Sequence, residues 1–130
     1  MDEHLELLKK YKFDKQIVKL NKALKGNSVV VYGAGAFFKK IKENYDLSNL
    51  NIIGISDLKY QHSDEGNLDM GYKIIPRDKI ADYNPDVLLI ATLRTFSIYK
   101  SFKTHLLKGA KIKIYPLVDK PFFELLKEAF

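Results

Sequence analysis

Residues 29–35, Val-Val-Val-Tyr-Gly-Ala-Gly, constrain the fold of this chain more than any other segment. Three β-branched valines followed by a tyrosine are typical of a short buried strand. Gly33 and Gly35 come next, and glycine permits the tight turn that joins a strand to a helix. A second apolar run, 52–56, is followed directly by Asp57. A strand, a glycine turn, a helix and an acidic residue after the next strand together outline a dinucleotide-binding β-α-β unit.

The rest of the chain continues to alternate between strand-like and helix-like segments. Residues 86–91, Asp-Val-Leu-Leu-Ile-Ala, form a nearly continuous apolar run of the kind found in a central parallel strand covered on both faces. Strands are expected at 28–32, 51–56, 71–75, 86–91 and 111–115, helices at 35–46, 77–83, 96–108 and 120–129, and a polar loop at 57–70. This alternation predicts an α/β fold, a Rossmann-like parallel sheet with helices on both faces. Because crossovers are right-handed, the expected strand order is 3-2-1-4-5.

Two further helices are expected before the first strand. Residues 2–11 carry apolar side chains at intervals of three, and residues 15–24 repeat a helical spacing before Gly26, a typical helix-ending residue. We therefore divide the chain into an N-terminal helical arm, 1–27, and a Rossmann-like domain, 28–130. The arm is expected to serve packing or dimerisation rather than to form part of the ligand pocket.

Composition excludes several classes of site. The chain has no cysteine, which rules out disulfides, thiolate catalysis and cysteine-based metal sites. No apolar run reaches the roughly 18 residues that a membrane span requires. Residues 1–4 are acidic and lack the apolar segment of a secretion signal. A cytoplasmic protein without a membrane partner is therefore expected.

The formal net charge of +6 comes from 22 basic and 16 acidic residues. Arginine occurs only at Arg77 and Arg94, and the lysines are spread along the whole chain. Proteins that bind nucleic acids use more arginine, because its planar fork matches phosphates and base edges. The composition therefore favours a solvated lysine surface and argues against nucleic-acid binding.

The glycine turn is the first candidate ligand site. Gly33 would form the tight turn, and Gly35 would let a phosphate approach the backbone between Ala34 and Ala36, at the start of a helix whose free amides favour anions. A complete dinucleotide fingerprint has a third small residue where this chain has Phe38. The alternative is that the glycines only shape the connection between strand and helix.

The other edges of the predicted crevice carry polar side chains. Asp57 follows the second strand, where an acidic residue can accept hydrogen bonds from ribose hydroxyls, and Lys59 could reach a phosphate. Thr92 and Arg94 follow the central strand, at the same edge of a parallel sheet, and Arg94 could pair with a pyrophosphate. The alternatives are that Asp57 is an ordinary loop or capping residue, that Thr92 or Thr95 caps the next helix, and that Arg94 is solvated.

No residues can be assigned to catalysis or to a metal. His4, His62 and His105 are far apart and show no metal-ligand spacing, so surface positions are expected for them. The acidic residues of the loop at 64, 65 and 69 are expected to be solvated. No nucleophile-elbow, phosphate-loop lysine or Tyr-x-x-x-Lys motif is present, which argues against a complete dehydrogenase or dehydratase.

Four segments taken in order resemble a known group over residues 28–118. They are Val-Val-Val-Tyr-Gly-Ala-Gly, Ile-Ile-Gly-Ile-Ser-Asp, Gly-Tyr-Lys-Ile-Ile-Pro and Asp-Val-Leu-Leu-Ile-Ala. The sequence resembles the small Rossmann-like domains of bacterial polysaccharide and nucleotide-sugar enzymes, which stand before sugar acetyltransferase and 4,6-dehydratase-type modules and beside some methyltransferases. The resemblance implies that Gly33, Ala34, Gly35 and Asp57 face a nucleotide or nucleotide-sugar. The chain stops near the end of this unit, so we expect a standalone subunit, a homo-oligomer or a domain of a larger enzyme.

Three functions follow as hypotheses. The first is an accessory module for sugar or cell-surface polysaccharide metabolism that binds a nucleotide, a dinucleotide such as NAD, or a nucleotide-sugar. The second is an NAD-dependent oxidoreductase, or its cofactor-binding half, completed by residues from another chain. The third is a structural or interaction domain with a degenerate pocket, in which Phe37 and Phe38 fill the ligand space.

Overall fold

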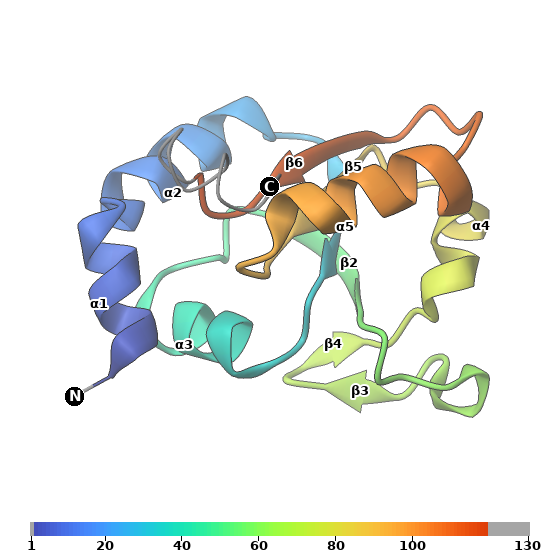
Figure 1. Cartoon of the computed structure of the whole chain (residues 1–130), viewed down its shortest axis with the longest axis horizontal. Helices are drawn as coiled ribbons and strands as arrows, with labels where there is room; N and C mark the ends of the chain where they lie inside the picture. Colours follow the sequence, from blue (N-terminus) through green and yellow to red (C-terminus); the bar gives the residue numbers. More distant parts are fainter. Residues whose placement is uncertain (1, 120–130) are drawn as a thin grey trace.

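A parallel sheet of four strands forms the centre of the molecule, as the sequence predicts for an α/β fold. The structure, a computed structural model, describes residues 2–119, except for the side chain of Phe96. The strand order is β2-β1-β5-β6 (Figure 1). The strands are β1 (Ser28–Tyr32), β2 (Asn51–Ser56), β5 (Val87–Ile90) and β6 (Lys113–Pro116). Each predicted strand of this sheet is therefore present within three residues of its expected boundaries.

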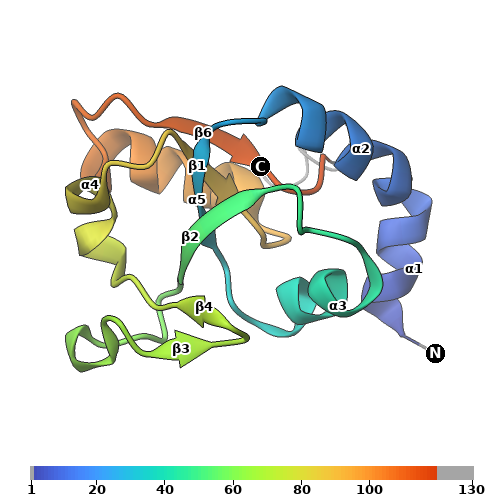
Figure 2. The same cartoon turned by 180° about the vertical axis from the view of Figure 1, so that it is seen from behind.

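Helices cover both faces of this sheet because its side chains alternate between two apolar cores. Val29 and Val31 belong to a core that includes residues of the first three helices, and Val30 and Tyr32 belong to a second core with Phe102. The helices on the first face are α1 (Glu3–Lys10), α2 (Phe13–Ala23) and α3 (Ala36–Asn44). On the second face lie α4 (Ile80–Tyr83) and α5 (Thr95–Ser101), which Figure 2 shows apart from the N-terminal helices.

The two N-terminal helices are part of the packed body of the protein. Leu8, Phe13 and Ile17 are buried in the same core as Val31 and Phe38. Asp2 caps α1 by accepting hydrogen bonds from the amides of its first turn, and its carboxylate also pairs with Lys40 Nζ of α3 at 2.8 Å. Along residues 2–119, no helix combines the length and the apolar character that crossing a membrane requires.

The predicted strand at 71–75 is much shorter in the structure. Tyr72–Lys73 (β4) pairs antiparallel with Leu68–Asp69 (β3) in a separate two-stranded sheet. Ile74 adds one isolated parallel bridge to Ile55 of β2. Met70 and Gly71 adopt left-handed backbone angles, with φ of 52° and 82°, which form the turn between β3 and β4. Because Tyr72 and Lys73 pair with β3 in this hairpin, the segment that pairs with β2 is shorter than the sequence predicts.

The last predicted helices also differ in detail. The helix expected over 96–108 begins as α5 and continues as a π-helical turn, Phe102–Leu106, in which the amide of Leu107 donates to the carbonyl of Phe102 at 2.8 Å. The segment 77–83 forms a short 3₁₀ turn, Arg77–Lys79, followed by α4. The helix expected over 120–129 lies outside the described residues.

Phe38 is the side chain whose loss should cost the fold most. Its ring is fully buried in the core between α3 and the sheet, so Phe38→Ala should lower the free energy of unfolding by about 3–5 kcal/mol. Leu68→Ala is the matched control, because Leu68 is 68% exposed and should lose less than about 0.5 kcal/mol. Urea unfolding followed by circular dichroism measures both values. Equal losses would contradict the packing described here.

Candidate functional site

The glycine turn packs directly against the loop that follows the central strand. Gly33 has φ of 114°, and a Cβ atom on it would lie 2.7 Å from Thr92 Cγ2 and 2.8 Å from the carbonyl oxygen of Ala91. Its amide donates to the carbonyl of Ser56 at 2.8 Å. The turn after β1 is therefore locked between the ends of β2 and β5, and only glycine fits there. Gly33 and Thr92 come together as the topology predicts.

Asp57 also lies at the glycine turn, where it binds the protein backbone. Its Oδ2 accepts a hydrogen bond from the amide of Ala34 at 2.7 Å, and its Oδ1 accepts one from the amide of Lys59 at 3.0 Å. Lys59 Nζ donates to the carbonyl of Ala34 at 2.7 Å. The backbone amide and the carbonyl of Ala34 are therefore both hydrogen-bonded to side chains of the segment after β2. We call these contacts of Asp57 and Lys59 with Ala34 the turn clasp.

Gly35 and Ala36 face the solvent beyond this clasp. Both residues are exposed, and a Cβ atom on Gly35 would meet nothing within 4 Å. Gly35 is the N-cap of α3 and has an extended backbone with φ of −93°, which any residue can adopt. Open space beside Gly35 is what a ligand approaching the turn would require.

The two phenylalanines after the turn point into the core. Phe37 packs edge-on against the ring of His4, with the ring centroids 5.3 Å apart, and Phe38 packs against Tyr72 at 6.3 Å. Both rings are buried in the core that contains Leu8. A full dinucleotide-binding fingerprint has a small residue where this chain has Phe38. The large side chain fits here because it points into the core between α3 and the sheet.

A cavity of about 340 Å³ lies next to the turn on the opposite face of the sheet. It opens beyond the carboxyl end of β1, between the segments that follow β2, β4 and β5 and the side of α5. Its lining consists of Tyr32, Leu58, Arg77, Arg94, Ser97, Ile98, Ser101 and Phe102. The carboxyl ends of parallel strands are where ligands bind in open α/β sheets.

Both arginines of the chain line this cavity. Arg77 is half-buried and Arg94 is exposed, and within residues 2–119 neither guanidinium forms an ion pair or a hydrogen bond with the chain. The carboxylate beside Arg77 in sequence, Asp78, is bound to His62 Nε2 at 2.8 Å, and this hydrogen bond lowers the pKa of Asp78. The sequence predicted Arg94 at this edge of the sheet, because it follows the central strand. Arg77 was missed, although its position directly after the strand-ending Pro76 places it at the same edge.

The loop that carries Thr92 is ordered by its own hydrogen bonds. Thr92 Oγ1 accepts from the amide of Arg94 at 3.3 Å, and Thr95 Oγ1 donates to the carbonyl of Thr92 at 3.1 Å. The N-cap residue of α5 is Arg94, and its side chain makes no capping bond. Neither threonine therefore caps the helix as the alternative interpretation expected, and the Arg94 side chain remains available at the cavity.

The polar loop between β2 and β4 is tied down by pairs of side chains. Tyr60 Oη donates to Asp69 at 2.6 Å, and Tyr83 Oη donates to Glu65 at 2.5 Å. Burial of the Tyr60 hydroxyl, together with its bond to Asp69, raises the pKa of Tyr60. The acidic residues that were expected to be only solvated thus anchor the loop that also carries Leu58. Their partners are tyrosines, which the sequence pattern did not indicate.

The histidines and acids do not form a metal centre in the part of the chain that the structure describes. Within that part, no three His, Asp or Glu side chains gather closely enough to hold a metal ion. His62 and His105 are exposed, as expected, whereas His4 is half-buried against Phe37.

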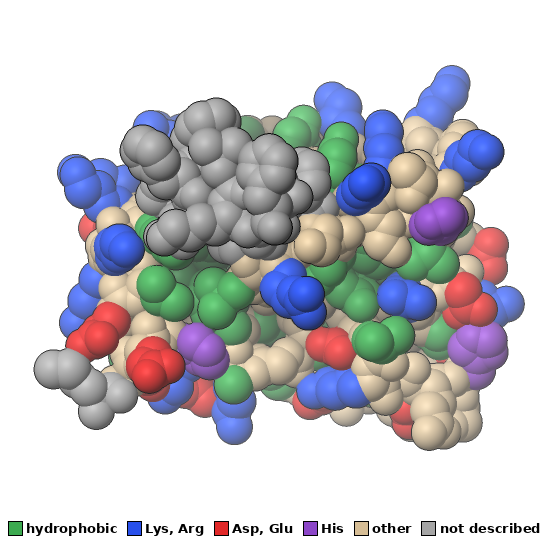
Figure 3. Space-filling model, viewed as in Figure 1, with side chains coloured by type: hydrophobic (Ala, Val, Ile, Leu, Met, Phe, Trp, Pro, Cys, Tyr) green, Lys and Arg blue, Asp and Glu red, His purple; other side chains and the backbone are tan. Residues whose placement is uncertain are grey.

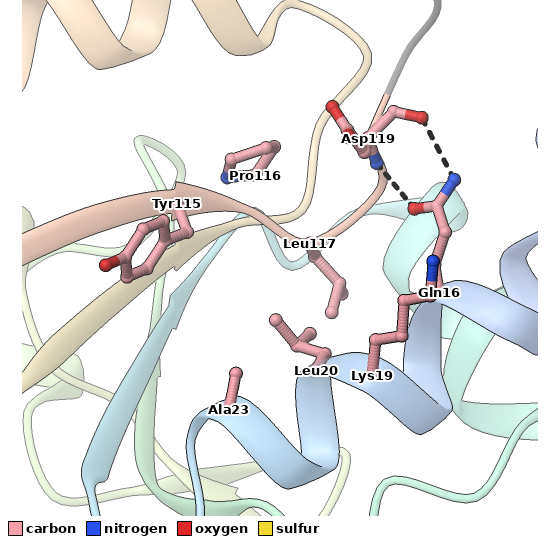
Figure 4. Close-up of a pocket in the computed structure, with 8 residues that line it drawn as sticks. All are labelled: Gln16, Lys19, Leu20, Ala23, Tyr115, Pro116, Leu117 and Asp119. Carbon is pink, nitrogen blue, oxygen red and sulfur yellow. Dashed lines mark hydrogen bonds between the residues drawn. The ribbon is translucent and has the colours of Figure 1, made fainter.

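A second cavity, of about 390 Å³, lies between α2 and the end of β6 (Figure 4). Leu20, Ala23 and Leu117 form much of its lining. Gln16 closes one end by exchanging two hydrogen bonds with the backbone of Asp119, at 2.7 and 3.0 Å. This cavity is larger, but its lining includes neither the glycine turn nor either arginine. We therefore take the arginine-lined cavity, which lies at the end of β1 beside the glycine turn, as the candidate site.

Surface charge alone does not mark a site. On the face shown in Figure 3, Lys and Arg side chains are scattered among acidic and apolar ones rather than gathered in one band.

No protein-family model matches the sequence, and neither does any curated protein. The functional assignment therefore depends on the geometry around the turn and the arginine-lined cavity.

The two glycines of the turn should respond differently to substitution. Gly33→Ala should destabilise the protein by at least about 1–3 kcal/mol, because its backbone angle is strained for alanine and the Ala91 carbonyl oxygen cannot move away freely. Gly35→Ala should cost less than about 1 kcal/mol, since it meets open space and loses only a favourable cap residue. Chemical denaturation of the two variants measures the difference. Similar stabilities would show that the turn does not interlock with β5.

Proposed function

We propose that this chain is a Rossmann-like module that binds a nucleotide, a dinucleotide or a nucleotide-sugar at the carboxyl end of its parallel sheet. The isolated bridge between Ile74 and Ile55 supports the strand order 3-2-1-4-5, because it places the β4 segment beside β2. The sequence resemblance to domains of bacterial polysaccharide enzymes supports an accessory role in sugar or cell-surface polysaccharide metabolism.

One observation carries the proposal. An arginine-lined cavity lies at the carboxyl end of β1, beside a turn in which Gly33 is sterically required. A cavity of about 340 Å³ falls in the range of small-molecule sites, which are concave and mostly apolar with a few polar groups. Guanidinium groups without an internal partner favour an anionic ligand, and phosphates are the anions they match best.

The neighbouring residues suit the sugar end of such a ligand. Each oxygen of Asp57 accepts one hydrogen bond from the backbone and keeps a lone pair for a ribose hydroxyl. The open space beside Gly35 lets a ribose or base approach the turn without a clash. Thr92 and Arg94 close the crevice from the side of β5. The ligand would lie across the glycine turn with its charged end toward the cavity.

Ligand binding should raise the melting temperature by mass action. A thermal-shift panel of NAD, NADP, UDP-glucose, coenzyme A and S-adenosylmethionine at millimolar concentration tests the proposal. A shift with at least one nucleotide, confirmed by isothermal titration calorimetry, is expected. Gly35→Val should weaken this binding strongly while the protein stays folded, because the side chain enters only open space. The absence of any shift in the wild-type protein would overturn the proposal.

Asp57 can be tested with a pair of matched ligands. Wild-type protein should bind ADP more tightly than 2′,3′-dideoxy-ADP, because only the former donates ribose hydroxyls to the carboxylate. Asp57→Ala should remove this preference, a change of about 1–3 kcal/mol in the binding free energy of ADP relative to its analogue. Calorimetric titration of both ligands measures it. An equal loss for both ligands would mean that Asp57 only holds the turn.

A further inference from the structure

The glycine turn already holds an anion of the protein itself. The carboxylate of Asp57 accepts the amide of Ala34 at 2.7 Å, which is the central amide of the turn. A phosphate seated at the same amide would have to displace that hydrogen bond and come close to a like charge. Lys59 brings a positive charge nearby, but its Nζ is bound to the carbonyl of Ala34. The turn clasp therefore makes this turn a poor phosphate site.

The arginine-lined cavity has the opposite character. Arg77 and Arg94 enter it from two separate segments, and neither guanidinium has a partner within the described chain. Ser97 and Ser101 of α5 line the same cavity, and each carries a hydroxyl group. Two guanidinium forks and two hydroxyl donors are a set of groups suited to a phosphate, which offers several acceptor oxygens.

A buried hydroxyl on the same face of the sheet as the cavity also has no hydrogen-bond partner within the described residues. Ser56 is fully buried, and its Oγ forms no hydrogen bond within the described chain. Ser56 pairs with Tyr32 across the parallel strands, and residues paired in this way point to the same face of the sheet. Because Tyr32 lines the cavity, the Ser56 hydroxyl lies on the same face of the sheet as the cavity, on the neighbouring strand β2.

We infer that Arg77 and Arg94 bind the phosphate of the ligand in the cavity against α5, and that the amides of the glycine turn do not. The inference rests on the proposed function for the nature of the ligand. The orientation that follows places the nucleoside over the turn and Asp57, and the terminal phosphate or phosphosugar between the two arginines. Arg77 becomes a specificity-determining residue that selects phosphorylated ligands over neutral nucleosides.

The test compares charge-removing variants at the two candidate phosphate positions. Arg77→Gln and Arg94→Gln probe the cavity, Lys59→Gln probes the turn, and Lys108→Gln is the matched control for loss of one exposed cation elsewhere. The probes are inorganic pyrophosphate, UMP and uridine, titrated by calorimetry at one fixed ionic strength. Neither arginine is paired within the described residues, so their variants should melt at the wild-type temperature, and a thermal melt checks this.

Each arginine variant should lose about ten-fold or more in affinity for pyrophosphate and UMP, since a hydrogen bond to a charged group contributes that much. Uridine should bind all variants as it binds the wild type. Lys59→Gln and Lys108→Gln should change the affinity for the phosphorylated probes less than three-fold, as expected for a screened charge.

Several results would overturn the inference. If only Lys59→Gln lost affinity for the phosphorylated probes, the phosphate would bind at the glycine turn. If Lys108→Gln lost as much affinity as the arginine variants, the effect would come from the overall charge of the protein and not from the cavity. Failure of pyrophosphate and UMP to bind the wild-type protein would also overturn it. Arginine-dependent binding of pyrophosphate without binding of any nucleoside-containing ligand would overturn the proposed function and leave the phosphate site standing.

Discussion

The close packing of Gly33 against the carboxyl end of β5 determines the geometry of this corner of the molecule. A side chain at this position would overlap Thr92 and the carbonyl of Ala91, so the chain can leave β1 this close to β5 only because the residue is glycine. The same contact brings the loop with Arg94, and α5 behind it, next to the end of β1. The arginine-lined cavity forms between these segments. A steric requirement of one residue thus places several functional candidates together.

Electrostatics then decides what each part of the corner can bind. A glycine turn before a helix ordinarily presents free amides to an anion. Here the carboxylate of Asp57 satisfies the amide of Ala34 and brings negative charge to it. Arg77 and Arg94, which have no partner within residues 2–119, instead line the cavity on the other face of the sheet. The turn clasp thus leaves the glycine turn less suited to an anion than the arginine-lined cavity.

Sequence patterns predicted those elements whose formation depends on local residues. The valines of β1 and the apolar run of β5 lie close to their expected ranges because buried strands need continuous apolar side chains. The β4 segment was overestimated because the left-handed backbone at Met70 and Gly71 favours a hairpin with β3. The π-helical turn at Phe102 follows no pattern that periodicity can detect. Arg77 was missed because its place at the same cavity as Arg94 depends on how two segments distant in the sequence pack together.

Asp57 shows why the sequence could indicate an edge of the sheet but not the partner that each side chain binds there. An acidic residue after the second strand is equally suited to a ribose hydroxyl and to a backbone amide of the turn, because the turn lies at the edge of the sheet where a ribose would bind. The distance to Ala34, which only a structure provides, shows that the backbone amide is bound. Lysine supplies nearly all of the basic charge of this chain. Two arginines converging on one cavity are therefore a more specific signal for an anionic ligand than either glycine.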